Sequence, residues 1–72
     1  MAYQLRKFQG RIVRLWRQKG YGFVAITGGN REAHFHLRDC DFGGDQISVG
    51  SRLEFFLEDN RHGLSAIRVS KT

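Results

Sequence analysis

The sequence predicts an all-β protein, a small antiparallel barrel built from five short strands. No segment sustains the 3.6-residue periodicity of a helix, and runs of alternating apolar residues are instead separated by turns rich in glycine, asparagine and aspartate. The 72 residues allow one hydrophobic core and no second domain. Because short strands leave edges that must be protected, a closed or nearly closed barrel is expected.

The first predicted strand, residues 8–17, has an irregular alternation. Ile12 and Val13 are apolar neighbours, which indicates a bulge or a strong curl, and Gly10 would permit it. Residues 1–7 show no clear period and are expected to form a loosely held lead-in, so the predicted domain spans residues 8–70.

The second predicted strand, residues 21–26, organises the rest of the chain. Period-two alternation places Lys19, Tyr21, Phe23 and Ala25 on one face, and Gly20, Gly22, Val24 and Ile26 on the other. If Val24 and Ile26 face the core, two aromatic rings point outward, where unpaired nucleobases can stack on them. The glycines are expected to serve close backbone approach or a bend. A strand buried on both faces, or a hairpin with chance surface aromatics, is the alternative.

Three further strands are predicted at residues 32–38, 52–58 and 64–69. In the first of them Ala33, Phe35 and Leu37 share one face, and His34, His36 and Arg38 share the other. Leu53, Phe55 and Leu57 form the inward face of the next strand, which leaves Phe56 outside that set. Residues 39–49 are predicted to be a long polar loop.

The charge balance favours a polyanionic partner. Lys and Arg number 12 against 7 acidic residues, giving a net charge of +5. A merely soluble basic protein is the alternative. The single cysteine, Cys40, fits a reducing compartment, and the chain has neither a signal-peptide pattern nor an apolar run long enough to cross a bilayer, so a cytoplasmic protein with no membrane partner is expected.

Four segments together resemble the cold-shock domain family. They are Gly10-Arg11-Ile12, the specific motif Lys19-Gly20-Tyr21-Gly22-Phe23-Val24, Ala33-His34-Phe35-His36-Leu37, and Gly63-Leu64-Ser65-Ala66-Ile67-Arg68-Val69. Their order and spacing match the family from about Phe8 to Val69. The resemblance implies a barrel of the oligonucleotide-binding (OB) type that binds single-stranded RNA and DNA with weak sequence selectivity and performs no catalysis.

The resemblance also implies binding residues. Lys19, Tyr21, Phe23 and His36 match the family's binding positions directly. Elsewhere the chain departs from the pattern. Arg14 replaces the family's surface tryptophan, Trp16 stands where asparagine is usual, His34 replaces a phenylalanine, and Leu37 replaces the aromatic residue after the histidine. With several stacking rings lost or moved, binding is expected to rely more on charge.

Several candidate residues have a plain structural alternative. Trp16 shares a face with Arg14, which favours binding over packing at the barrel end, and His34 and His36 could stack or could simply be solvated. Phe42 could reach a base or cap the core. Arginines and lysines that could rim the site, each equally explained as a surface charge, are Arg11, Arg14, Arg17, Lys19, Arg31 and Arg38.

Metal and enzyme chemistry have little support in the sequence. His34, His36 and Cys40 are possible zinc ligands, but no second cysteine or carboxylate cluster completes the set, so no metal or other cofactor is expected. No nucleophile has an evident base, and the glycines form no phosphate-cradling loop. No small-molecule substrate is therefore expected.

Two functions remain from the sequence. The leading one is a single-stranded nucleic-acid binder that acts as an ATP-independent chaperone, and the other is a protein-interaction module that uses Trp16, Tyr21 and Phe23. The oligomeric state stays open, with a monomer favoured.

Overall fold

The strands form a single sheet that closes on itself. The computed structural model describes residues 2–3, 6–61 and 63–72. Its strands are β1 (Ala2–Tyr3), β2 (Phe8–Trp16), β3 (Tyr21–Ile26), β4 (Glu32–His36), β5 (Arg52–Asn60) and β6 (Gly63–Lys71). Their order is β1-β5-β2-β3-β4-β6, and β5 also pairs with β6, so β2 to β6 close a five-stranded barrel. The predicted all-β, OB-type barrel is confirmed.

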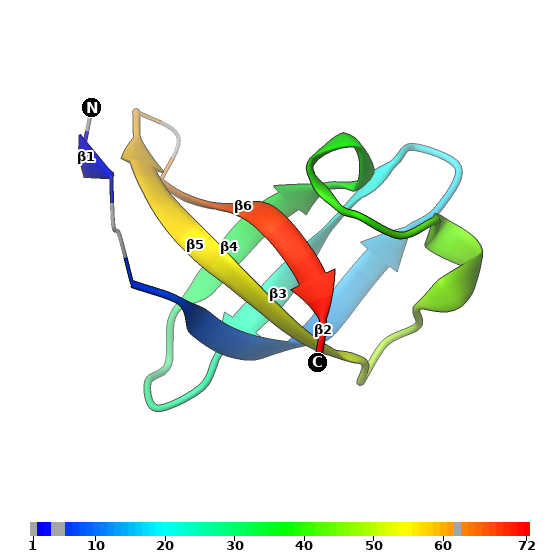
Figure 1. Ribbon diagram of the computed structural model, residues 1–72, viewed down its shortest axis with the longest axis horizontal. Coiled ribbons are helices and arrows are strands. Elements are labelled where there is room, and N and C mark those ends of the chain that lie inside the picture. Colours follow the sequence, from blue (N-terminus) through cyan, green and yellow to red (C-terminus); the bar gives the residue numbers. More distant parts are fainter. Residues whose placement is uncertain (1, 4–5, 62) are drawn as a thin grey trace.

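Figure 1 shows β5 and β6 crossing in front of β2, β3 and β4. Neighbouring strands in the sheet pair antiparallel except at the closure, where β4 and β6 run parallel and His34 pairs with Ser65. The described residues contain two 3-10 turns, η1 (Leu37–Asp39) and η2 (Gly44–Gln46), and no helix that is long and apolar enough to span a membrane.

The predicted irregularity in the first strand is a β-bulge at Val13. The register between β2 and β3 shifts between Ile12 and Arg14. Ile12 is 1% exposed and Val13 is 36% exposed. The extra residue reverses the alternation, so Arg14 points outward although Ile12, two residues earlier, points inward.

The glycines of β2 and β3 allow these strands to approach closely. A Cβ atom at Gly10 would collide with the Ala25 carbonyl oxygen, and one at Gly22 would collide with the Arg14 carbonyl oxygen. Gly20 has φ +80°, which supplies the bend before β3. The close-approach and bend roles predicted for Gly22 and Gly20 are therefore confirmed. Gly10 serves strand packing, whereas we had expected it to permit the bulge.

The core consists of side chains from every strand of the barrel and from one loop. Its buried members are Ile12, Val24, Ala33, Phe35, Ile47, Leu53, Phe55, Leu57, Ala66 and Val69. The inward faces predicted for these strands are confirmed for Ala33 and Phe35 of β4 and for the β5 set. Leu37, predicted on the same face as Phe35, lies in η1 and is only partly buried.

Ile47 was missed, because it lies in the segment predicted to be a polar loop. Arg17 fixes this segment: its Nε donates to the Gly44 carbonyl oxygen at 2.9 Å, and its Nη2 donates to the Ile47 carbonyl oxygen at 2.6 Å. The Ile47 side chain is 3% exposed. The loop is therefore part of the fold, and Arg17 is a structural clamp.

Several strand limits differ from the prediction: β2 ends one residue earlier, at Trp16, and β5 and β6 are each two or three residues longer than predicted. The third predicted strand ends at His36, because the Leu37 amide donates to the Gly20 carbonyl oxygen at 2.9 Å and the chain turns into η1. Strand β1 lies in the segment predicted to be a loose lead-in, and its backbone pairs with Asp59 and Glu58 of β5. The sequence did not predict this strand, because two residues are too few to show a period.

Candidate nucleic-acid interface

Outward residues of β2, β3 and β4 line up in rows across the sheet. In one row Trp16 pairs with Tyr21 and Tyr21 pairs with His36. In the next row Arg14 pairs with Phe23 and Phe23 pairs with His34. We call the five rings of these rows the aromatic platform: Trp16, Tyr21, Phe23, His34 and His36.

The platform rings contact one another continuously. Ring centroids lie 5.2 Å apart for Trp16 and Tyr21, 5.3 Å for Phe23 and His34, and 4.5 Å for His34 and His36. The ring planes are tilted, from 41° for Trp16 and Tyr21 to 86° for the two histidines. The surface is therefore faceted rather than one flat plane.

The faces predicted for the second strand are confirmed. Val24 is fully buried, while Tyr21 and Phe23 remain half-buried on the outside of the barrel. Trp16 is 39% exposed, which makes it one of the large hydrophobic side chains in the described residues that remain exposed. Ring area held at the surface in this way is available to a ligand.

Arg14 covers part of the platform. Its guanidinium carbon lies 4.5 Å from the Phe23 ring centroid. Its Nη2 donates to Glu32 Oε1 at 2.6 Å. Glu32 was missed as a site residue. The sequence did contain a signal for it, because Glu32 precedes His34 and His36 on the same outward face of the predicted strand.

The pKa of His34 is lowered from its ordinary value of 6.5 by partial burial, and then by the positive charges of His36 and Arg38. His34 is therefore neutral near pH 7. A neutral imidazole in this position can stack on a base or form a hydrogen bond with it.

The other predicted binding residues lie in different settings. Lys19 is exposed in the turn between β2 and β3, and its backbone amide donates to the Trp16 carbonyl oxygen at 3.1 Å. Arg38 is exposed and, with His34 and His36, lines a hollow of about 300 Å³. Phe42 is partly buried against the core, which favours the capping alternative. Lys19 and Arg38 therefore border the platform, and Phe42 does not join its ring contacts.

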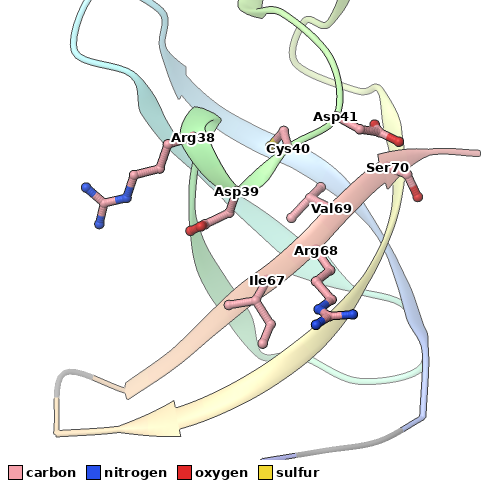
Figure 2. Close-up of a pocket in the computed structure, with 8 residues that line it drawn as sticks. All are labelled: Arg38, Asp39, Cys40, Asp41, Ile67, Arg68, Val69 and Ser70. Atoms are coloured by element: carbon pink, nitrogen blue, oxygen red, sulfur yellow. The ribbon is translucent and has the colours of Figure 1, made fainter.

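A second hollow, of about 470 Å³, lies between η1 and β6 (Figure 2). Arg38 and Arg68 extend to opposite sides of it, and Asp39 and Asp41 add negative charge to its lining. Burial, and then these two carboxylates, raise the pKa of Cys40 to about 12. Its thiol donates to the His36 carbonyl oxygen at 3.3 Å. Cys40 stays protonated and is a poor nucleophile or metal ligand near neutral pH.

Across residues 6–61 and 63–72, no three His, Cys, Asp or Glu side chains are grouped closely enough to hold a metal ion. His34, His36 and Cys40 are included in this finding, so the candidate zinc ligands do not converge.

Comparison with protein families decides what kind of domain this is. The family model described as the 'Cold-shock' DNA-binding domain matches residues 8–72. This chain belongs to the cold-shock domain family. The resemblance seen in the motifs is confirmed, and the family is one that binds nucleic acid and is generally without enzymatic activity.

Solved structures agree on the fold of this cold-shock domain. A structure titled drosophila Unr CSD456 superposes with a TM-score of 0.77 at 24% sequence identity. The alignment covers 93% of this chain and 27% of that one, so the domain spans about a quarter of that structure's length. Comparison with curated proteins found no match.

Proposed function

We propose that this cold-shock domain binds single-stranded RNA and DNA by stacking unpaired bases on the aromatic platform. The observation that carries the proposal is the register of β2, β3 and β4, which places Trp16, Tyr21, Phe23, His34 and His36 side by side on the outer face. Paired bases in a duplex hide the faces that such rings would contact, so unpaired strands are preferred.

Basic side chains supply the second part of the interaction. Lys19 and Arg38 are exposed beside the platform, and Arg14 lies on it. The whole chain carries a net charge of +5. Neutralising phosphates with these groups releases counterions, so affinity falls as salt rises. A protein-binding aromatic patch would lack this steep dependence.

Binding of this kind makes the domain an ATP-independent nucleic-acid chaperone. A protein that binds only the unpaired form of a hairpin shifts the equilibrium toward that form by mass action. No energy source is required, because the free energy comes from the binding itself.

Fluorescence anisotropy of labelled oligonucleotides tests the proposal. Phe23→Ala should weaken binding to a single strand by about 1–3 kcal/mol, the usual contribution of one stacked ring. The salt slope should stay nearly unchanged, since no phosphate contact is lost. Phe56→Ala is the matched control, because this ring lies on β5 facing Lys7, whose Nζ is 6.0 Å from its centroid.

Circular dichroism must show that both variants are folded. Equal affinity for a duplex and for a single strand of the same length would contradict the stacking model. If folded Phe23→Ala binds like the parent, the protein-interaction alternative replaces the proposal.

A further inference from the structure

A pair of arginines lies one row beyond the aromatic platform. Arg11 of β2 pairs with Ala25 of β3 on one side and with Arg52 of β5 on the other. Both arginine side chains are exposed on the outer face of the barrel. Like charges directly opposite each other destabilise a sheet, so the fold itself gains nothing from this arrangement.

The carboxylates near this pair are already engaged. Glu32 accepts a hydrogen bond from Arg14 at 2.6 Å, and Glu54 accepts one from Lys7 at 3.2 Å. Within residues 6–61 and 63–72, neither Arg11 nor Arg52 has a side-chain hydrogen bond or an ion pair. Two arginines at paired positions of neighbouring strands thus leave their guanidinium donors unused.

A small hollow lies between the two arginines. It has a volume of about 110 Å³ and is lined by Gln9, Gly10, Arg11, Thr27 and Arg52. Its side chains offer two guanidinium forks, an amide and a hydroxyl, all of which can donate to oxygen. The Thr27 amide donates to the Gln9 carbonyl oxygen at 2.8 Å, which fixes one part of the rim. The size suits a single phosphate group rather than a whole nucleotide.

The hollow continues the line of the platform. Successive outward residues of a strand are about 7 Å apart, so the row of Arg11 lies one such step from the row of Phe23. That step is comparable with the spacing of neighbouring nucleotides in an extended strand. A strand whose bases stack on Phe23 and Tyr21 could therefore place a backbone phosphate over the hollow.

We propose that Arg11 and Arg52 form a phosphate clamp for the backbone of the single strand bound on the platform, which extends the binding path onto β5. This inference rests on the proposed function. Arginine forks bind phosphate oxygens in a bidentate manner, and a bound phosphate also removes the repulsion between the two guanidinium groups.

Oligonucleotide length provides the test. Labelled oligothymidylates of about four to ten nucleotides span the site sizes of OB folds. For the parent protein, affinity should rise when the strand becomes long enough to cover both platform and clamp. Arg52→Ala should abolish that rise and lower the salt slope for the longer strands by roughly one ion, while the shortest strands bind as they do to the parent.

Arg61→Ala is the matched control. It removes the same charge just beyond the other end of β5, about 30 Å along the strand from Arg52. Thermal unfolding should show Arg52→Ala folded and at least as stable as the parent, since a like-charge contact is lost.

Two results would overturn the clamp. One is an unchanged length dependence and salt slope in folded Arg52→Ala. The other is an equal loss in Arg61→Ala, which would leave only the effect of net charge. Failure of the stacking model would show differently, as an absence of any loss in Phe23→Ala with the shortest strands.

Discussion

The guanidinium of Arg14 is shared between a ring and a carboxylate. Its carbon atom lies 4.5 Å from the centroid of the Phe23 ring, and its Nη2 donates to Glu32 Oε1 at 2.6 Å. Both side chains of the ion pair are about half exposed, at 54% and 42%, so the pair contributes at most about 1 kcal/mol to stability. In the free domain Glu32 therefore balances the charge of Arg14, and the guanidinium covers one face of the Phe23 ring. A phosphate group could compete with Glu32 for this guanidinium.

Neutralising Glu32 should strengthen binding. Glu32→Gln removes the competitor of the ligand phosphate, so affinity for a single strand should rise by about 0.5–1 kcal/mol and the salt slope should become steeper. Titration at several salt concentrations measures both. Asp45→Asn, which removes the same charge in η2, is the control, and an equal gain in that variant would contradict a local role for Glu32.

At the level of elements, β4 presents two imidazoles to the same surface. The His34 ring contacts the rings of Tyr21 and Phe23 on β3. The ring centroids of His34 and His36 are 4.5 Å apart. Arg38, Asp39 and Glu58 line the hollow next to both histidines. Burial, and then electrostatic repulsion from His36 and Arg38, oppose protonation of His34 in the free domain, whereas a ligand phosphate would favour it.

Affinity should therefore increase in acid. In the free domain the pKa of His34 lies below 6.5, and a phosphate bound beside it would raise that pKa. Binding should therefore be nearly flat above about pH 7 and strengthen as the pH falls through and below 6.5. His34→Phe keeps a ring and removes the proton, so it should flatten this profile without losing stacking. An unchanged profile in His34→Phe would place the titrating group elsewhere.

The stability of the free domain should change in the opposite direction over the same window. The folded pKa of His34 is lowered, so below pH 6.5 the unfolded chain takes up the proton first. The contribution of neutral His34 is present above pH 6.5 and is lost as the pH falls toward the folded pKa. Binding and unfolding must therefore be measured separately at each pH.

At the scale of the whole molecule, the barrel contains a second register shift. The pairing of β5 with β6 changes between Glu54 and Phe56. Arg68 lies at this point of β6 with φ +50°, a conformation that costs an L-residue about 1–2 kcal/mol. The irregularity turns Val69 into the core, where it is 1% exposed and pairs with Cys40.

Glycine at position 68 should stabilise the barrel. Arg68→Gly relieves the backbone strain but adds chain entropy to the unfolded state, so a net gain of about 0.5–1 kcal/mol is expected. Arg68→Val removes the same charge and should destabilise by more than 1 kcal/mol, because a β-branched residue is strained at positive φ. Urea unfolding of the two variants compares them, and equal stabilities would show that the backbone at this position relaxes freely.

Local patterns in the sequence predicted most of the barrel and the platform. Period-two alternation is sufficient to place Phe55 inside and Phe23 outside, and the neighbouring apolar pair at Ile12 revealed the bulge. Ile47 is buried in a loop whose backbone is bonded by the distant Arg17, and no local pattern encodes that contact. The parallel closure and the partnership of Arg14 with Glu32 likewise join separate strands and leave no local signal.

Strand β5 pairs with β1, β2 and β6, so it connects the earliest and the latest parts of the chain. Every ring of the platform precedes Leu37, but Leu53, Phe55 and Val69, which fill the core beneath, come from β5 and β6. A growing chain that has left the ribosome only as far as β4 therefore has its platform rings without the interior that supports them. Because these contacts join segments distant in sequence, we expect the barrel to close, and the surface to be completed, only after β6 has been synthesised.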